Sequence, residues 1–225
     1  MRFRKYALLV SSALLVVSVA IGLIIAVTSL PASDTGLLPI VSAHLATSGV
    51  SHPVTAVLLN FRGYDTLLEM AVLLLALAGT WSLVPLDTHV GTTSHSPGEV
   101  LDSLTRLLTP VIVLVAGYLL WAGGHAPGGA FQAGALLAAL GVMIHLTGWH
   151  LPIELTSIYL RFIHVCGLIV FLSVAVSGWF SGASFFSFPP DLAGMLILLI
   201  ETFAMLSIGL TLATLFLLGR PYSAP

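Results

Sequence analysis

Long apolar stretches alternate with short polar ones along this chain, and the pattern predicts membrane-spanning helices. About 20 apolar residues are needed to cross the hydrocarbon core of a bilayer. Six stretches of roughly this length are bounded by turn-forming or charged residues, and they run from Ala7 to Val27, Tyr64 to Val84, Leu107 to Gly123, Phe131 to Trp149, Arg161 to Ser181 and Asp191 to Gly219. We therefore predict an all-α, polytopic membrane protein with six transmembrane helices.

Composition supports the same class and removes several others. Of the 225 residues, 58% are hydrophobic and only 7% are charged, against about 25% charged residues in soluble domains. A net charge of −2 without basic clusters excludes the electrostatic footprint of nucleic-acid binding. The single cysteine, Cys166, leaves no disulfide, cysteine-ligated zinc or iron–sulfur cluster within the chain. We expect no metal and no cofactor.

The placement of Lys and Arg predicts the orientation, because these residues in short loops lie mainly on the cytoplasmic side. With a cytoplasmic N-terminus, Arg62 alone of the seven basic residues falls outside. The other six fall at cytoplasmic ends, and they are Arg2, Arg4, Lys5, Arg106, Arg161 and Arg220. Both termini are therefore expected in the cytoplasm. In an alternative interpretation, residues 1–32 are a cleaved signal peptide, although the apolar run of the first span is longer than the 7–15 residues usual in such peptides.

Ionisable side chains inside a membrane are costly, so each is a candidate for an ion or proton path. Four lie within the predicted spans: Glu69 in the outer third, Glu201 near the middle, and His145 and His164 in the inner third. His125 lies at the outer mouth, in the turn between the third and fourth spans. We expect these five residues to be the ion or proton path candidates, and we expect no catalytic residues.

Each candidate also has a structural interpretation. Thr66 and Glu69 have the spacing of a capping box, which would satisfy the first amides of the second span. His145 and His164 can each be packed histidines that bind a backbone carbonyl. Glu201 has only apolar neighbours one turn away on its own helix, so its partner must come from another helix, another subunit or water.

The turn between the third and fourth spans is rich in glycine. Residues 123–134 read Gly-Gly-His-Ala-Pro-Gly-Gly-Ala-Phe-Gln-Ala-Gly. Irregular backbone at membrane depth is tolerated where protein buries it or where it lines a cavity, and small residues also permit close helix approach. We therefore expect this loop to be buried and structurally important, through Gly124, Pro127, Gly128, Gly129, Phe131 and Gly134.

Two segments within residues 99–220 resemble the MrpB (MnhB) component of the multisubunit Mrp-type cation/proton antiporters. These are Leu-Asp-Ser-Leu-Thr-Arg-Leu-Leu-Thr-Pro at 101–110 and the loop at 124–134. The signature of that component is G-H-x-x-P-G-G-G-F-x-G-G. This chain has one residue fewer between His125 and Pro127, and alanine replaces glycine at Ala130 and Ala133. The resemblance implies that residues 104–225 form a four-span domain.

Residues 60–70, Asn-Phe-Arg-Gly-Tyr-Asp-Thr-Leu-Leu-Glu-Met, resemble the D-F-R-G-F-D-T-x-x-E motif at the C-terminal end of MrpA, the large component of the same antiporters. This resemblance covers residues 52–84, with Asn60 in place of the acidic residue. Arg62 and Asp65 flank the same turn, and we expect them to pair. In related membrane-bound hydrogenase and sulfur-reducing complexes the region is a separate small subunit. The resemblance implies a fusion: a two-span unit at 1–84, a cytoplasmic linker at 85–103, and the MrpB-like domain.

These resemblances imply an accessory, non-enzymatic subunit of a Na⁺/H⁺ antiporter complex in a bacterial or archaeal cytoplasmic membrane. The implied partners are A-, C- and D-like subunits, small subunits and lipids, and the implied transported ions are Na⁺ and protons. Two alternatives stay open. One is a membrane-arm subunit of a respiratory or hydrogenase-type pumping complex, and the other is a purely structural spacer.

Overall fold

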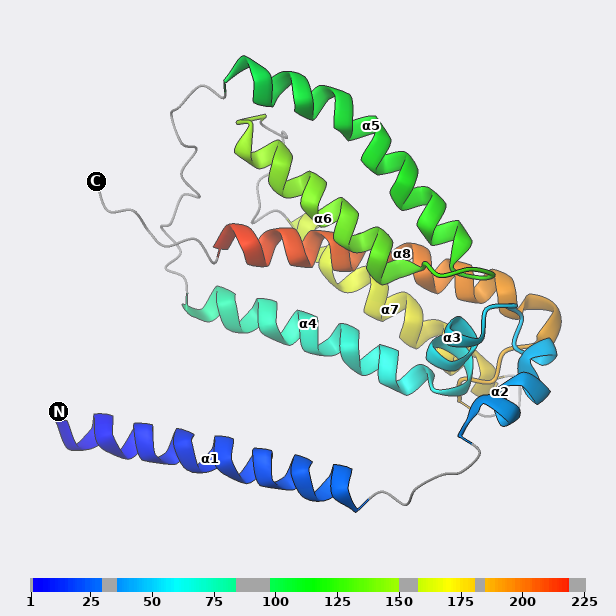
Figure 1. Ribbon diagram of the computed structural model, residues 1–225, viewed down its shortest axis with the longest axis horizontal. Coiled ribbons are helices and arrows are strands. Elements are labelled where there is room, and N and C mark those ends of the chain that lie inside the picture. Colours follow the sequence, from blue (N-terminus) through cyan, green and yellow to red (C-terminus); the bar gives the residue numbers. More distant parts are fainter. Residues whose placement is uncertain (1, 30–35, 84–97, 150–157, 181–184, 219–225) are drawn as a thin grey trace. The chain divides into compact units, whose positions relative to one another are not determined.

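The computed structural model describes residues 2–29, 36–83, 98–149, 158–180 and 185–218. All regular elements in these ranges are helical, which confirms the predicted all-α class. The main helices are α1 (Arg2–Thr28), α2 (Leu38–His44), α3 (Pro53–Ala56), α4 (Gly63–Leu83), α5 (Glu99–Ala122), α6 (Ala130–Leu146), α7 (Ile158–Phe180) and α8 (Pro190–Leu218), shown in Figure 1. A π-helical segment (Val57–Phe61) leads from α3 towards α4.

Five helices of the described residues are long and apolar enough to cross a membrane, namely α1, α4, α5, α7 and α8. The chain is therefore a multi-pass membrane protein. The remaining predicted span, Phe131–Trp149, corresponds to α6, which has 17 residues and a length of about 25 Å at 1.5 Å per residue. It ends early because Gly148 takes a left-handed conformation with φ +70°, and such a glycine terminates helices.

The chain divides into two compact units, residues 1–39 and 40–225. The first unit carries α1. In the second unit, α4 to α8 alternate in direction, as Figure 1 shows, and α8 packs against α4, α5, α6 and α7. The core gathers around α8, with Phe171, Met70, Ile197 and Ile200 fully buried. The predicted linker at 85–103 lies mostly outside the described residues, and its last five residues begin α5.

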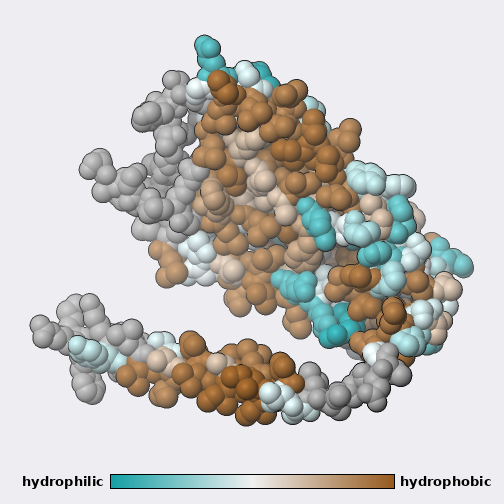
Figure 2. Space-filling model, viewed as in Figure 1, coloured by the Kyte–Doolittle hydropathy of each residue, from teal (hydrophilic) through white to brown (hydrophobic). Residues whose placement is uncertain are grey.

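Glycines allow α8 to approach its neighbours closely, as expected from the sequence. A Cβ atom at Gly134 on α6 would lie 3.1 Å from Ile208 on α8, and one at Gly167 on α7 would lie 2.8 Å from the Ser207 Cβ atom. Figure 2 shows that the visible surface over the helices of the second unit is mainly hydrophobic, while hydrophilic residues gather near the ends. Such a surface suits contact with lipid or with other membrane helices.

A polar cluster joins the start of α5 to Trp149, three residues after the end of α6. The Asp102 carboxylate accepts hydrogen bonds from Arg106 Nε at 2.8 Å and from Trp149 Nε1 at 2.7 Å. The Arg106 guanidinium carbon also lies 5.0 Å from the centre of the Trp149 ring, within the range of a cation–π interaction. The cluster links the two ends of the α5–α6 hairpin. The other end of the hairpin is the loop of residues 123–129, which we call the glycine loop.

Candidate functional site

The glycine loop between α5 and α6 is held by hydrogen bonds from two segments of the chain. Within its own hairpin, the Gly129 N–H donates to the Leu119 carbonyl at 2.8 Å. From the segment before α4, the N–H groups of Ser51 and His52 donate to the Gly124 carbonyl at 2.9 and 3.1 Å. The Thr55 hydroxyl, which is buried, donates to the carbonyl of Gly123. These contacts satisfy irregular backbone that lipid cannot satisfy.

The segment before α4 that donates hydrogen bonds to the glycine loop was not identified from the sequence as part of the site. Ser51, His52 and Thr55 lie in a polar stretch around Pro53, and nothing local marks which carbonyls they bind. Only the fold brings this stretch to the glycine loop. The sole sequence signal is the number of polar side chains and amides just before a span, which need partners near the membrane.

Glu201 on α8 lies directly beneath this loop and is only 5% exposed. The backbone N–H of Ala130, the first residue of α6, hydrogen-bonds its carboxyl group. The free amides and the dipole at a helix N-terminus stabilise a carboxylate there. The partner that α8 itself cannot supply therefore comes from another helix of the same chain, one of the options expected from the sequence.

Two glycines make room for the Glu201 carboxylate. A Cβ atom at Gly123 would lie 3.2 Å from Glu201 Oε1, and one at Gly129 would lie 2.5 Å from the same atom. Gly129 also has φ +110°, which side-chain-bearing residues rarely adopt. The glycine signature in the sequence thus has a specific physical reason: it lets backbone cover a buried carboxylate.

Two cavities meet at Glu201. The first has a volume of about 900 Å³, and its lining includes Ser51, Trp121, His125 and Glu201. The second has a volume of about 480 Å³, and its lining includes Thr55, Glu69, Phe131 and Glu201. Both are large enough to hold several water molecules. The carboxylate therefore faces two separate spaces within the second unit.

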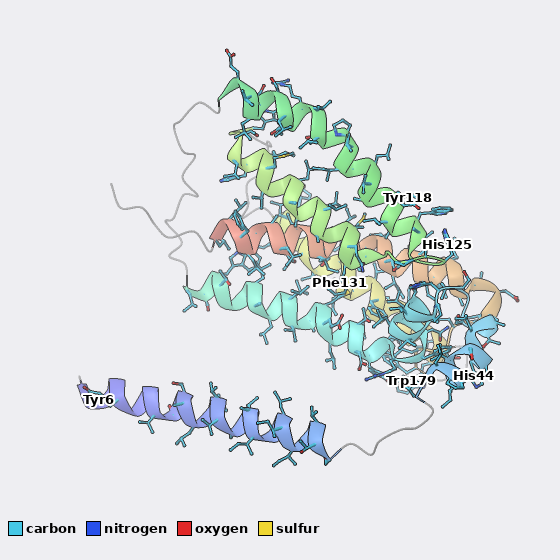
Figure 3. The ribbon with its side chains drawn as sticks, in the orientation of Figure 1. Tyr6, His44, Tyr118, His125, Phe131 and Trp179 are labelled. Atoms are coloured by element: carbon cyan, nitrogen blue, oxygen red, sulfur yellow. The ribbon has the colours of Figure 1, made fainter. Side chains whose placement is uncertain are left out.

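His125 lies at the first cavity and is exposed. Its ring packs edge-on against Trp121, with the ring centroids 4.4 Å apart. Figure 3 shows His125 beyond the end of α5, with Tyr118 on the preceding turn and Phe131 at the start of α6. The predicted position of His125 at the outer mouth depends on the orientation in the membrane and stays a prediction.

Glu69 lines the second cavity and takes no part in a capping box. Helix α4 begins at Gly63, so Thr66 lies inside the helix, and its hydroxyl donates to the Leu58 carbonyl at 2.7 Å. The capping-box interpretation of Thr66 and Glu69 is therefore wrong. The reason is that α4 begins at Gly63, just after the π-helical segment and Arg62, whereas a helix capped by Thr66 would begin four residues later, at Leu67.

The expected pair at the same turn is present. Arg62 Nη2 lies 2.6 Å from Asp65 Oδ2, with side chains 60% and 44% exposed. Ion pairs this exposed contribute little to stability. In the structure the partner of Arg62 at this turn is therefore Asp65.

His164 and His145 line neither of these two cavities. His164 is buried between α4, α7 and α8, where Nδ1 lies 2.7 Å from the Leu160 carbonyl oxygen and Nε2 lies 3.1 Å from Thr214 Oγ1. His145 lies in the last turn of α6. The structure thus brings Glu201, Glu69 and His125 to adjoining cavities, and it places the other two histidines elsewhere.

Within the described ranges, no group of three or more His, Cys, Asp and Glu side chains could hold a metal ion. What the arrangement provides is a buried carboxylate, held by a helix N-terminus, between two spaces in an apolar helical bundle. A buried ionisable group in a membrane-spanning helix is a candidate functional site. The fold and the site together define a polytopic membrane protein with a buried carboxyl group between two cavities.

Comparison with known proteins identifies the family. Residues 100–219 match the family described as a domain related to the MnhB subunit of Na⁺/H⁺ antiporter, and the chain belongs to this family. An uncharacterized protein of Methanocaldococcus jannaschii is 32% identical in an alignment of 149 residues that covers 57% of this chain. The match spans 56% of that relative, so the chain covers about half of its length.

Two solved structures share the fold. One is a chain of the membrane-bound sulfane sulfur reductase, an archaeal respiratory membrane complex, with a TM-score of 0.70 and 23% identity over 92% of this chain and 95% of that chain. The other is a chain of the Mrp complex from Dietzia sp. DQ12-45-1b, with a TM-score of 0.63 and 24% identity. That match covers 98% of this chain and 26% of the other.

Proposed function

We propose that the chain is an accessory membrane subunit of a Mrp-type complex that exchanges Na⁺ for protons. Membership of the MnhB-related family supports this function. So does the fold shared with chains of two multisubunit membrane complexes. The observation that carries the proposal is the position of Glu201, whose buried carboxylate lines both cavities.

In this proposal Glu201 binds the ion or proton that passes between the two cavities. The Ala130 N–H holds the carboxyl group in place, and the glycine loop covers it without a side chain. His125 lies on the side of the first cavity and Glu69 on the side of the second. Water in the cavities would connect these groups, because each cavity is large enough for several water molecules and has polar side chains in its lining.

The organisation that accompanies this function follows the sequence motifs. We propose that α6 crosses the membrane together with the five longer helices, which gives six spans. Both termini then lie in the cytoplasm, and the membrane is a bacterial or archaeal cytoplasmic membrane. Residues 1–84 act as the unit that resembles the tail of MrpA, and residues 104–225 act as the MrpB-like domain. The partners are A-, C- and D-like subunits and small subunits. The contacts of Ser51, His52 and Thr55 with the glycine loop support direct cooperation of the two segments.

The test is Glu201→Gln in the intact complex, because glutamine keeps the shape and the hydrogen-bonding capacity but does not titrate. Inverted vesicles or proteoliposomes report Na⁺-dependent pH change, and the purified complex reports subunit content. Exchange should fall at least tenfold while every subunit remains. Glu99→Gln is the matched control, since Glu99 is an exposed glutamate at the start of α5 and should leave exchange unchanged.

The alternatives give different results. Full exchange in an intact Glu201→Gln complex would leave the chain a structural spacer. A membrane-arm role in a redox-driven complex is the second candidate, and the fold shared with a chain of the sulfane sulfur reductase favours it. Flavin, iron–sulfur or nickel proteins in the purified complex would establish that candidate in place of the pure antiporter.

A further inference from the structure

The second cavity is much larger than one monovalent inorganic cation requires, and most of its wall is apolar. Its volume of about 480 Å³ lies in the range of pockets that hold small organic ligands. Leu58 and Leu59 line it from the π-helical segment, Met70 from α4 and Phe131 from α6. An apolar wall does not solvate a small ion, but it does stabilise an organic group that leaves water.

The same cavity is lined by the carboxyl groups of two glutamates. Glu69 and Glu201 both line it, and its described lining contains no Lys or Arg. Arg62, which is close to Glu69 in the sequence, is paired with Asp65. His52 is the other titratable group of the lining, and its Nδ1 atom lies 3.3 Å from Thr55 Oγ1. Glu201 is buried and Glu69 is exposed, and a carboxylate beside apolar side chains is stabilised by a cation that reaches it.

We propose that this cavity binds amphipathic organic monocations. A guanidinium or ammonium head pairs with Glu69 and Glu201, and an alkyl or aryl body occupies the space beside Leu58, Met70 and Phe131. A guanidinium matches carboxylate geometry with two parallel hydrogen bonds. This binding goes beyond ion exchange, because it depends on the shape and the charge of the cavity and not on transport.

The probes are n-alkylguanidinium ions from methyl to hexyl, measured by equilibrium dialysis against the purified, intact complex at constant detergent concentration. Binding should saturate at one site per copy of this chain. Each added methylene should tighten binding about fourfold until the cavity is full, as expected from about 0.8 kcal/mol per buried methylene. The neutral isostere n-hexylurea should show no saturable binding, which separates the site from simple partition into detergent.

Two variants test the two halves of the proposal. Glu69→Gln should weaken every member of the series at least tenfold. Leu58→Ala should weaken hexylguanidinium several-fold but leave methylguanidinium unchanged, and because Leu58 is 39% exposed its truncation should not disturb the core. Glu99→Gln is the control and should bind like the parent complex.

The result that overturns the proposal is unsaturable uptake, or saturable binding that neither variant weakens. No binding at all, as when a neighbouring subunit fills the cavity, overturns it too. The readout is direct binding, so its failure is distinct from failure of the proposed function. If Glu201→Gln keeps full exchange while alkylguanidinium ions still bind, only the proposed function falls.

Discussion

A Cβ atom at Gly129 would lie only 2.5 Å from Glu201 Oε1, so the carboxylate has room there because Gly129 has no side chain. This close approach joins the middle of α8 to the N-cap residue of α6. It also explains why a loop of glycines lies over the carboxylate. Substitutions in the loop, or in the elements that hold it, should therefore disturb the site.

Gly129→Ala should disturb the site more than its small change in size suggests. Its φ of +110° costs about 1–3 kcal/mol for a residue with a side chain, and its Cβ would displace the Glu201 carboxylate. Exchange by the complex should fall at least tenfold. Gly117→Ala is the matched control, because a Cβ atom there meets nothing within 4 Å. Equal exchange in both variants would contradict the packing described for Glu201.

Thr55→Val should loosen the glycine loop. The substitution keeps the size of the side chain but removes the hydroxyl that binds the Gly123 carbonyl, which leaves a buried acceptor unpaired at a cost of about 1–3 kcal/mol. Hydrogen–deuterium exchange of residues 123–130 should become faster, and Na⁺-dependent exchange should slow. Thr55→Ser retains the hydroxyl and should behave like the parent. Unchanged deuterium uptake in Thr55→Val would show that this contact does not hold the loop.

Gly167→Ala should destabilise the packing of α7 on α8. A Cβ atom there would lie 2.8 Å from the Ser207 Cβ atom and 3.0 Å from the Ala204 Cα atom. Overpacking of this kind costs about 1–3 kcal/mol, so the midpoint of thermal unfolding of the detergent-solubilised complex should fall. In the comparison variant Gly141→Ala the added methyl meets Ala213 at 3.4 Å, an ordinary contact. Its midpoint should stay level or rise, and the opposite order would refute the close approach.

Labelling should reveal the proposed orientation. In a Cys166→Ala background, Thr47→Cys, just after α2, should react with a membrane-impermeant maleimide added outside intact cells. Glu99→Cys, at the start of α5, should react only after the membrane is opened. Both positions are exposed in the structure, so accessibility is decided by the side of the membrane. Labelling of Glu99→Cys in intact cells would reverse the topology.

The sequence alone was sufficient to predict the class of protein and most of its membrane-spanning helices. Apolar runs of membrane-spanning length predict α1, α4, α5, α7 and α8, because the bilayer requires every backbone group of a span to be paired within its own helix. The same rule explains why a lone buried carboxylate, Glu201, stands out without any knowledge of its surroundings. The pairing of Arg62 with Asp65 was also predicted, because both residues flank one turn.

Tertiary structure decided what those residues touch. The sequence contained Glu201 and Gly129 as two separate features, and only the packing of α6 on α8 places one against the other. The tertiary structure also decided that the Thr66 hydroxyl binds the Leu58 carbonyl and does not cap a helix. It decided as well that the His164 ring contacts Leu160 and Thr214. The physical reason is the separation along the chain of the residues involved. A membrane span depends on the composition of neighbouring residues, whereas side-chain contacts and cavities depend on which helix faces pack together.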